Sequence, residues 1–317
     1  MNNVSSPTAP LGRTVYIKLV LVQLFWAGTF VASEIALHAQ PAGVTALTRY
    51  VLTTSIYAAL CLILSKHRLS EKLRTVTALQ WLALVGMGFF GVLLYTVLLN
   101  IGLTRSTATY AALLIPTTQP IFTALLSRFV FREKASQALV AGLTLGLMGA
   151  ACVIWSDLQQ HDDKQLSGNI IILLSALSFS LYAVCSKFAP SQLSSLENTT
   201  LSFVFGTLLL IPVPCLLGER YSLAGADTQF WLSIGYLVIF ATLLPYLWWN
   251  EATKEIGSAR TDVFTFLMPP LAVVLSTLLL GHLPLTLQIV GGVLAMLGVS
   301  LSTFNFSRFT VSKVGKA

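Results

Sequence analysis

Long apolar runs alternate with short polar connections along the whole chain. A helix that crosses a bilayer takes roughly 20 mostly apolar residues. Stretches such as 170–177 and 208–213 are almost continuously apolar, whereas the strands of an outer-membrane barrel alternate apolar and polar positions. The pattern therefore predicts ten transmembrane helices, over residues 15–37, 44–65, 79–100, 107–131, 136–155, 168–187, 197–217, 230–250, 259–281 and 285–304.

Composition supports this interpretation and excludes a soluble enzyme. The 317 residues are 55% hydrophobic and only 10% charged, with a mean hydropathy of +0.79, whereas soluble domains carry about 25% charged residues. The longest connection, residues 156–167, leaves no room for a soluble catalytic domain. We expect an all-α integral membrane protein with the lipid bilayer as its surroundings.

The distribution of basic residues predicts the orientation. The net charge of +7 is scattered between apolar runs, so nucleic acid is not an expected partner. Lys and Arg in short loops resist translocation. With the N-terminus inside, twelve fall on the cytoplasmic side and three on the other side, namely Arg105, Lys164 and Arg220. This predicts a multi-pass protein of the plasma membrane, or bacterial inner membrane, with a disordered cytoplasmic N-terminus (1–14) and a basic cytoplasmic tail (305–317).

The second half of the sequence repeats the first. At an offset of 150 residues, Trp81 and Asn100 align with Trp231 and Asn250. At an offset of 149, Pro120, Gly142 and Gly149 align with Pro269, Gly291 and Gly298. The alternative is two bundles that share only a hydrophobic composition. Two repeats, residues 15–155 and 168–304, each with an odd number of spans, would enter the membrane in opposite orientations, as in many secondary carriers.

The chain resembles the ten-span EamA-type carriers of the drug/metabolite transporter superfamily. The resemblance rests on residues 25–32 (FWAGTFVA), on Thr48-Arg49-Tyr50, on the prolines of the fourth and ninth spans and on the spaced glycines of the fifth and tenth. It implies a secondary carrier that exports small metabolites, amino acids or drug-like solutes. Glu133 fits the acidic end that the family usually places after the fourth span, but Gly281-His282 replaces it after the ninth.

Two charged residues inside the predicted spans are candidates for function. Glu34 lies near the outer end of the first span, and Arg49 lies at a similar depth in the second. In a functional interpretation, Glu34 takes up a proton or binds an ammonium group, while Arg49 holds a carboxylate or influences the protonation of Glu34. In a structural interpretation, the two form an ion pair that ties adjacent helices together.

Prolines predict breaks in two helices. Pro116 and Pro120 interrupt the fourth span, and Pro269 and Pro270 interrupt the ninth. A proline removes a backbone donor, so the helix can kink or open and expose polar backbone at the depth of a binding site. Gln119, beside the first break, is therefore a candidate binding residue. A packing kink without ligand contact is the alternative.

Aromatic and small residues complete the set of candidates. Four aromatic side chains in the spans could wall a cavity for flat or cationic solutes: Trp26, Tyr110, Tyr182 and Tyr246. The glycines at 142, 146 and 149, with those at 291 and 298, predict either close helix packing or the seam of a homodimer.

Taken together, these features favour a secondary transporter that moves a small molecule by alternating access. An exchanger of anionic sugar phosphates or nucleotide sugars is the alternative, but it would need several buried cations, and only Arg49 lies well inside a span. The sequence has no metalloprotease, hydrolase or nucleotide-binding motif, and its four cysteines are not closely paired, so we expect no enzyme, metal or cofactor. A non-transporting membrane assembly protein also stays open.

Overall fold

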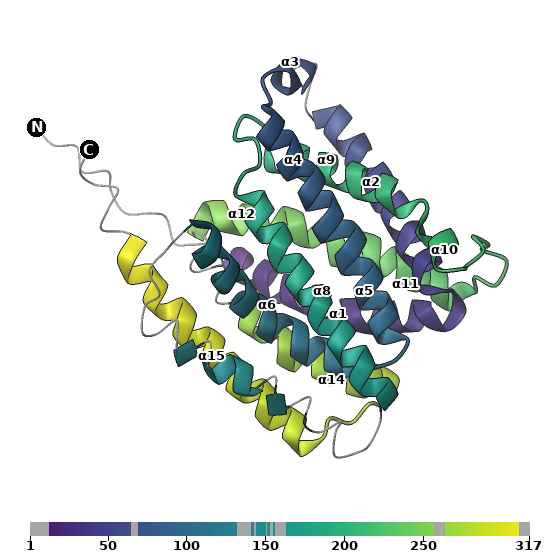
Figure 1. The fold of residues 1–317 in the computed structure, drawn as a ribbon, viewed down its shortest axis with the longest axis vertical. Coiled ribbons are helices and arrows are strands. Elements are labelled where there is room, and N and C mark those ends of the chain that lie inside the picture. Colours follow the sequence, from purple (N-terminus) through teal and green to yellow (C-terminus); the bar gives the residue numbers. More distant parts are fainter. Residues whose placement is uncertain are drawn as a thin grey trace, which may run out of the picture.

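The computed structural model describes residues 13–64, 69–131, 141–142, 144–149, 151–152, 155, 163–256, 261 and 264–310. Every element assigned within these ranges is a helix (Figure 1). The expected N-terminal segment falls largely outside the described residues, and the expected fifth span is described only in part. The last helix continues to Thr310, so the first part of the expected tail is helical.

The helices of the first half are α1 (Arg13–Ala39), α2 (Ala42–Leu64), α3 (Leu69–Arg74), α4 (Ala78–Met87), η1 (Gly88–Leu94), α5 (Tyr95–Leu103) and α6 (Ala108–Phe131). Those of the second half are α8 (Asp163–Ser186), α9 (Ser195–Leu210), α10 (Val213–Leu216), α11 (Thr228–Val238), η2 (Ile239–Leu243), α12 (Leu244–Ile256), η3 (Phe264–Leu267), α14 (Met268–Leu280) and α15 (Thr286–Thr310). The segments α4–η1–α5 and α11–η2–α12 are each one continuous rod.

Seven of the described helical rods are long and apolar enough to cross a membrane, and Met268–Leu280 and Thr286–Gly298 are shorter apolar helices. Large apolar side chains point outward from these rods: Leu62, Phe129 and Leu278 are 76%, 78% and 75% exposed. Such surfaces suit contact with lipid tails and not with water. The structure is therefore that of an all-helical, multi-pass membrane protein.

The two halves share local features that the sequence pattern did not predict. A π-helical segment, in which backbone hydrogen bonds span five residues, interrupts the rod at Gly88–Leu94 and again at Ile239–Leu243. The side chains of Thr77 and Asp227, also 150 residues apart, each accept a hydrogen bond from a backbone N–H at the start of these rods. The third rod of each half therefore begins at a side-chain cap and contains a π-helical segment.

The first long helix of each half packs mainly against helices of the other half. The α1 helix packs against the α11–η2–α12 rod and α14, while α8 packs against the α4–η1–α5 rod and α6. The last turns of α1 and the first turn of α8 line the same cavity, which includes Glu34, His38, Lys164 and Gln165. The first helices of the two halves therefore run in opposite directions.

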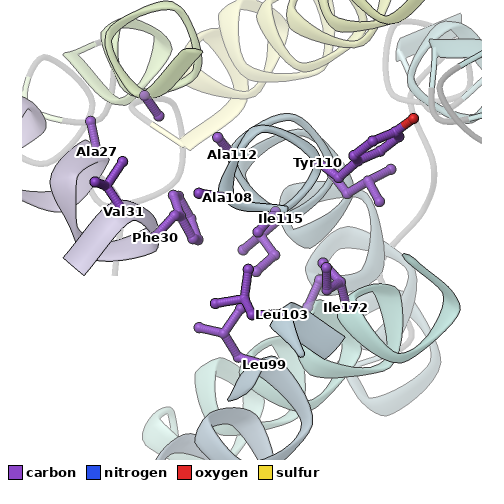
Figure 2. Close-up of a cluster of buried hydrophobic side chains, with 14 residues drawn as sticks. Ala27, Phe30, Val31, Leu99, Leu103, Ala108, Tyr110, Ala112, Ile115 and Ile172 are labelled. Atoms are coloured by element: carbon purple, nitrogen blue, oxygen red, sulfur yellow. The ribbon is translucent and has the colours of Figure 1, made fainter. Parts of the chain in front are cut away.

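A hydrophobic core joins both halves (Figure 2). Small residues such as Ala27, Ala108 and Ala112 let α1 and α6 approach closely, and Phe30 fills the space between them. The core takes its buried residues from α1, α5, α6, α8 and α14: Ala27, Phe30, Val31, Leu99, Leu103, Ala108, Tyr110, Ala111, Ala112, Leu114, Ile115, Ile172, Ala176 and Ala272.

The expected opening at Pro116 and Pro120 is wrong, because α6 remains helical through both prolines. The hydroxyls of Thr117 and Thr118 donate to the carbonyls of Leu113 and Leu114, one turn earlier. Helices α1, α8, α14 and α15 surround α6, so packing holds its path despite the missing donors. In the second half, Pro269 and Pro270 occupy the first turn of α14, directly after η3, where a proline costs little.

The spaced glycines let two helical segments of this chain pack closely against each other. A Cβ added to Gly298 would lie 2.5 Å from the carbonyl oxygen of Gly142 and 2.6 Å from the amide nitrogen of Gly146. The backbone of α15, which Figure 1 shows at the edge of the bundle, therefore rests directly on Gly142 and Gly146. Of the two interpretations of these glycines, close helix packing accounts for the contact at Gly298.

Connections at the two ends of the bundle fasten one half to the other. The carboxylate of Glu219, shortly after α10, accepts hydrogen bonds from the N–H groups of Gly43 (2.9 Å) and Val44 (3.1 Å) at the start of α2. Lys72, in α3, forms an ion pair of 2.9 Å with the buried Glu197 at the start of α9. The connection between α2 and α4 thus holds the start of α9. In the same way, the connection between α10 and α11 holds the start of α2.

Replacing Glu219 with alanine is expected to lower the free energy of unfolding by about 1 kcal/mol, because the first N–H groups of α2 lose their acceptor and the helix dipole loses a favourable charge. Glu251→Ala is the matched control, since Glu251 forms an exposed pair with Lys18 and such pairs contribute ~0–1 kcal/mol. Thermal unfolding in detergent should rank wild type, Glu251→Ala and Glu219→Ala in that order. Equal melting temperatures for the two variants would contradict the role of Glu219.

Candidate functional site

Arg49 is buried in α2, with 8% of its surface exposed. Its Nη2 donates one long hydrogen bond of 3.4 Å to Oγ1 of Thr242, and its Nε has no hydrogen-bond partner among the residues that the structure describes. The guanidinium lies over the ring of Tyr50, 5.3 Å from the ring centre. A buried cation–π contact contributes on the order of 2 kcal/mol, while a charge in the bilayer costs at least ~2.5 kcal/mol on insertion scales and far more in simulations. The charge of Arg49 is therefore only partly compensated.

The expected Glu34–Arg49 pair is wrong. Glu34 instead accepts a hydrogen bond from the backbone N–H of Ala108, and its Oε1 lies 3.6 Å from Nδ1 of His282. The reason is that α1 packs mainly against α11, α12 and α14 of the other half, and has little contact with α2. Similar depth in the membrane did not bring the two side chains to the same face.

Aromatic residues from both halves cluster beside Arg49. Tyr57, eight residues after Arg49 on the same face of α2, contacts the ring of Phe203 in α9 at 5.0 Å between centroids. Tyr246 of α12 contacts both Tyr57 (6.3 Å) and Phe203 (6.4 Å). The hydroxyl of Tyr246 lies 3.1 Å from that of Tyr182 in α8. We call Tyr50, Tyr57, Tyr182, Phe203 and Tyr246 the aromatic cluster.

The π-helical segments shape this cluster. Thr242, in η2, donates a hydrogen bond of 2.8 Å to the carbonyl of Leu237, five residues earlier, and accepts the bond from Arg49. Its own carbonyl accepts a hydrogen bond of 3.5 Å from Tyr57. In η1, a Cβ on Gly91 would lie 2.5 Å from Cδ2 of Tyr182, so the glycine provides the space for this ring. Both π segments therefore contribute to the site.

Tyr57, Phe203 and Thr242 were not among the residues predicted from the sequence. A signal for Tyr57 was present, because Arg49, Thr53 and Tyr57 recur every fourth residue and so lie on one helical face. Phe203 and Thr242 gave no comparable signal. The position of Thr242 depends on the π segment, which shifts the helical register by one residue.

The other candidates lie elsewhere in the bundle. Trp26 contacts Trp249 of α12, with 5.1 Å between ring centroids. Tyr110 belongs to the hydrophobic core, and its hydroxyl points away from Ala27 and Phe30 (Figure 2). The backbone carbonyl of Gln119 accepts a hydrogen bond of 2.9 Å from Ser180 in α8. Of the four aromatic residues singled out in the sequence, the structure thus joins Tyr182 and Tyr246 directly.

A separate cavity of about 340 Å³ lies at the end of the bundle where α1 ends. Glu34 is its acidic residue, and His38, Arg105 and Lys164 are its basic ones. The contacts of Glu34 connect three parts of the chain here: α1, the first residue of α6 and the connection after α14. A carboxylate at the start of α6 is favourable because the helix dipole presents unpaired N–H groups there.

Comparison with known proteins agrees with this architecture. The EamA-like transporter family matches residues 13–155 and, as a second repeat, residues 166–304. The uncharacterized transporter YdfC of Bacillus subtilis is 30% identical over 92% of this chain and 90% of its own. A probable terminal-alkyne amino-acid exporter of Streptantibioticus cattleyicolor is 28% identical over 89% of this chain and 91% of its own.

A solved crystal structure has the same fold, with a TM-score of 0.61 at 20% identity, and the match covers 94% of this chain and 99% of the other. Two family repeats and several apolar helices make this a multi-pass membrane protein, and its relatives point to a transporter and not to an enzyme. The chain belongs to the EamA-like transporter family.

Proposed function

We propose that the protein is a secondary transporter that exports small metabolites such as amino acids by alternating access. The observation that carries this proposal is the aromatic cluster, because Tyr57 comes from the first half while Tyr182, Phe203 and Tyr246 come from the second. A movement of one half against the other would open or close this cluster. The named amino-acid exporter among the relatives supports both the solute class and the direction.

The proposed topology has ten membrane-spanning helices in two inverted five-helix repeats. We place the protein in the plasma membrane, with both termini in the cytoplasm. The opposite directions of α1 and α8 support the inversion. The shared features of the α4–η1–α5 and α11–η2–α12 rods support the repeat. The fifth span of each repeat would be formed by residues 136–155 and by α15.

Export in exchange for protons would require a group that can hold a proton, and we propose Glu34 for this role. Glu34 and Glu197 are the buried carboxylates of the described residues. Glu197 is neutralised by Lys72, whereas Glu34 lines the cavity at the end of α1. The sugar-phosphate alternative is less supported, because Arg49 is the one buried cation among the described residues and a doubly charged phosphate would need more.

Reconstitution into liposomes tests the proposal. The wild-type protein is expected to give saturable flux of at least one solute from a panel of amino acids, their amides and organic cations. Tyr182→Phe, which removes the hydroxyl contact to Tyr246, is expected to reduce this flux several-fold, with Tyr16→Phe at the start of α1 as the matched control. A folded protein that moves none of the panel would contradict transport, and equal flux in both variants would remove the cluster from the pathway.

A further inference from the structure

Arg49 carries a positive charge that no acidic side chain among the described residues neutralises within 4 Å. The buried carboxylates bind elsewhere: Glu34 to Ala108 and His282, and Glu197 to Lys72. Glu219 is also engaged, at the start of α2. With Nε unpaired and only one long hydrogen bond from Nη2, the guanidinium keeps donors that a ligand can occupy.

We infer that the transported solute bears a carboxylate, which Arg49 binds, and an apolar or aromatic body, which the aromatic cluster contacts. This inference rests on the proposed transport function and specifies its substrate class. A guanidinium presents parallel N–H groups that match the two oxygens of a carboxylate, and such a pair is strongest where water is excluded. The single buried cation favours a group with one negative charge over a phosphate with two.

Thr242 and Tyr50 keep the guanidinium in position for this contact. Thr242 accepts from Nη2, while Tyr50 supports one face of the guanidinium. Thr242 itself is held by its bond to Leu237 within η2. Because η2 belongs to the second half and Arg49 to the first, a carboxylate bound here would lie at the contact between the two halves.

The rest of the cluster indicates what the carboxylate is attached to. Tyr57 and Phe203 are buried, with 3% and 6% of their surfaces exposed, and they meet edge to face. Tyr246 adds a third ring. Such rings favour an apolar or aromatic body, and the paired hydroxyls of Tyr182 and Tyr246 supply hydrogen bonds beside it. Monocarboxylates with hydrophobic side groups, including apolar amino acids, fit these surroundings.

Matched ligands test the inference on the wild-type protein in nanodiscs. The probes are phenylalanine, 3-phenylpropionate, which lacks the ammonium group, and phenylalaninamide, which lacks the carboxylate, followed by the same series for leucine and methionine. Binding is measured by intrinsic tryptophan fluorescence and by thermal shift. The acids are expected to bind, and each amide is expected to bind at least about 30-fold more weakly, because the amide cannot form the ionic pair. Equal binding of acids and amides would overturn the inference.

Variants of Arg49 give a second, independent readout. Arg49→Gln is expected to weaken carboxylate binding about 100-fold, and Arg49→Lys about 10-fold, because lysine keeps the charge but not the paired donors. Arg74→Gln, at the exposed end of α3, is the control and should match wild type. If Arg49→Gln does not fold, Arg49→Lys and the comparison of acids with amides still test whether Arg49 binds the carboxylate of the solute. Unchanged carboxylate binding in a folded Arg49→Gln variant would overturn the inference.

The flux assay separates failure of this inference from failure of the proposed function. Saturable flux of amides or organic cations, without binding of any carboxylate, would leave transport standing and would overturn the carboxylate assignment. If the folded wild-type protein neither binds nor moves any member of the panel, transport and the carboxylate assignment fail together.

Discussion

Replacing Gly88 with alanine is expected to destabilise the protein by about 1–3 kcal/mol, the usual cost of forcing extra atoms into a packed interior. A Cβ at this position would lie 2.6 Å from the amide nitrogen of Gly206 and 2.6 Å from the carbonyl oxygen of Ser202. These are backbone atoms of α9, so they cannot rotate away as a side chain would. Gly88→Leu, with three more carbons, is expected to leave no folded protein.

Gly235→Ala provides a control with the opposite sign. Gly235 lies within α11, and no atom of the described residues lies within 4 Å of the position that a Cβ would take. Alanine is favoured over glycine in a helix by about 0.5–1 kcal/mol, so this variant should melt above the wild type while Gly88→Ala melts below it. Thermal unfolding followed by size-exclusion chromatography measures both. A Gly88→Ala variant as stable as Gly235→Ala would show that α9 does not lie against η1 as the structure has it.

The sequence predicted an all-helical membrane protein with two repeats, because apolar runs and repeated residues can be recognised without knowledge of the tertiary contacts. Apolar runs of the right length mark the rods, and Trp81 and Trp231 sit at equivalent positions of the repeated third rod. The π segments were not predictable in this way. A π segment inserts one residue into a helical turn. The contacts that accompany it here are tertiary: Gly88 of η1 lies against α9, and Thr242 of η2 accepts a hydrogen bond from Arg49.

The site was predicted less well because depth along a helix does not determine its neighbours. Glu34 and Arg49 were expected to pair because consecutive spans are often adjacent, but α1 packs into the opposite half. In the site itself, Tyr246 of the second half meets both Tyr57 of the first half and Tyr182 of its own half. Residue types in the spans indicated the chemistry, while only the packing of the two halves showed which residues share a site.

The contacts between the halves also suggest how movement could be limited. Glu219 holds α2 at one end of the bundle and Lys72 holds α9 at the other. These two helices carry Tyr57 and Phe203 of the aromatic cluster. Glu34 adds a third connection, between α1, α6 and His282, at the same end as Glu219. Because Glu34 belongs to the first half and His282 to the second, a movement of one half against the other at that end would break the contact between them.

Replacing Glu34 with glutamine is expected to uncouple transport from a proton gradient. Glutamine can still accept the hydrogen bond from Ala108 but cannot take up a proton or pair with His282. Exchange of solute at equal pH on both sides should therefore persist, while acceleration by a pH gradient should be lost. Flux into liposomes with and without an imposed gradient measures this difference, and acceleration that survives in Glu34→Gln would exclude Glu34 as the proton carrier.

Glu34→Ala removes the acceptor as well, and it is expected to lower stability by about 1–2 kcal/mol, because the first N–H of α6 loses its partner. His38→Ala is the control at the same cavity, since His38 is exposed, and its melting temperature should match that of wild type. A Glu34→Ala variant as stable as His38→Ala would show that Glu34 does not fasten α1 to α6. Comparing alanine with glutamine thus separates the structural role of the carboxylate from its capacity to carry a proton.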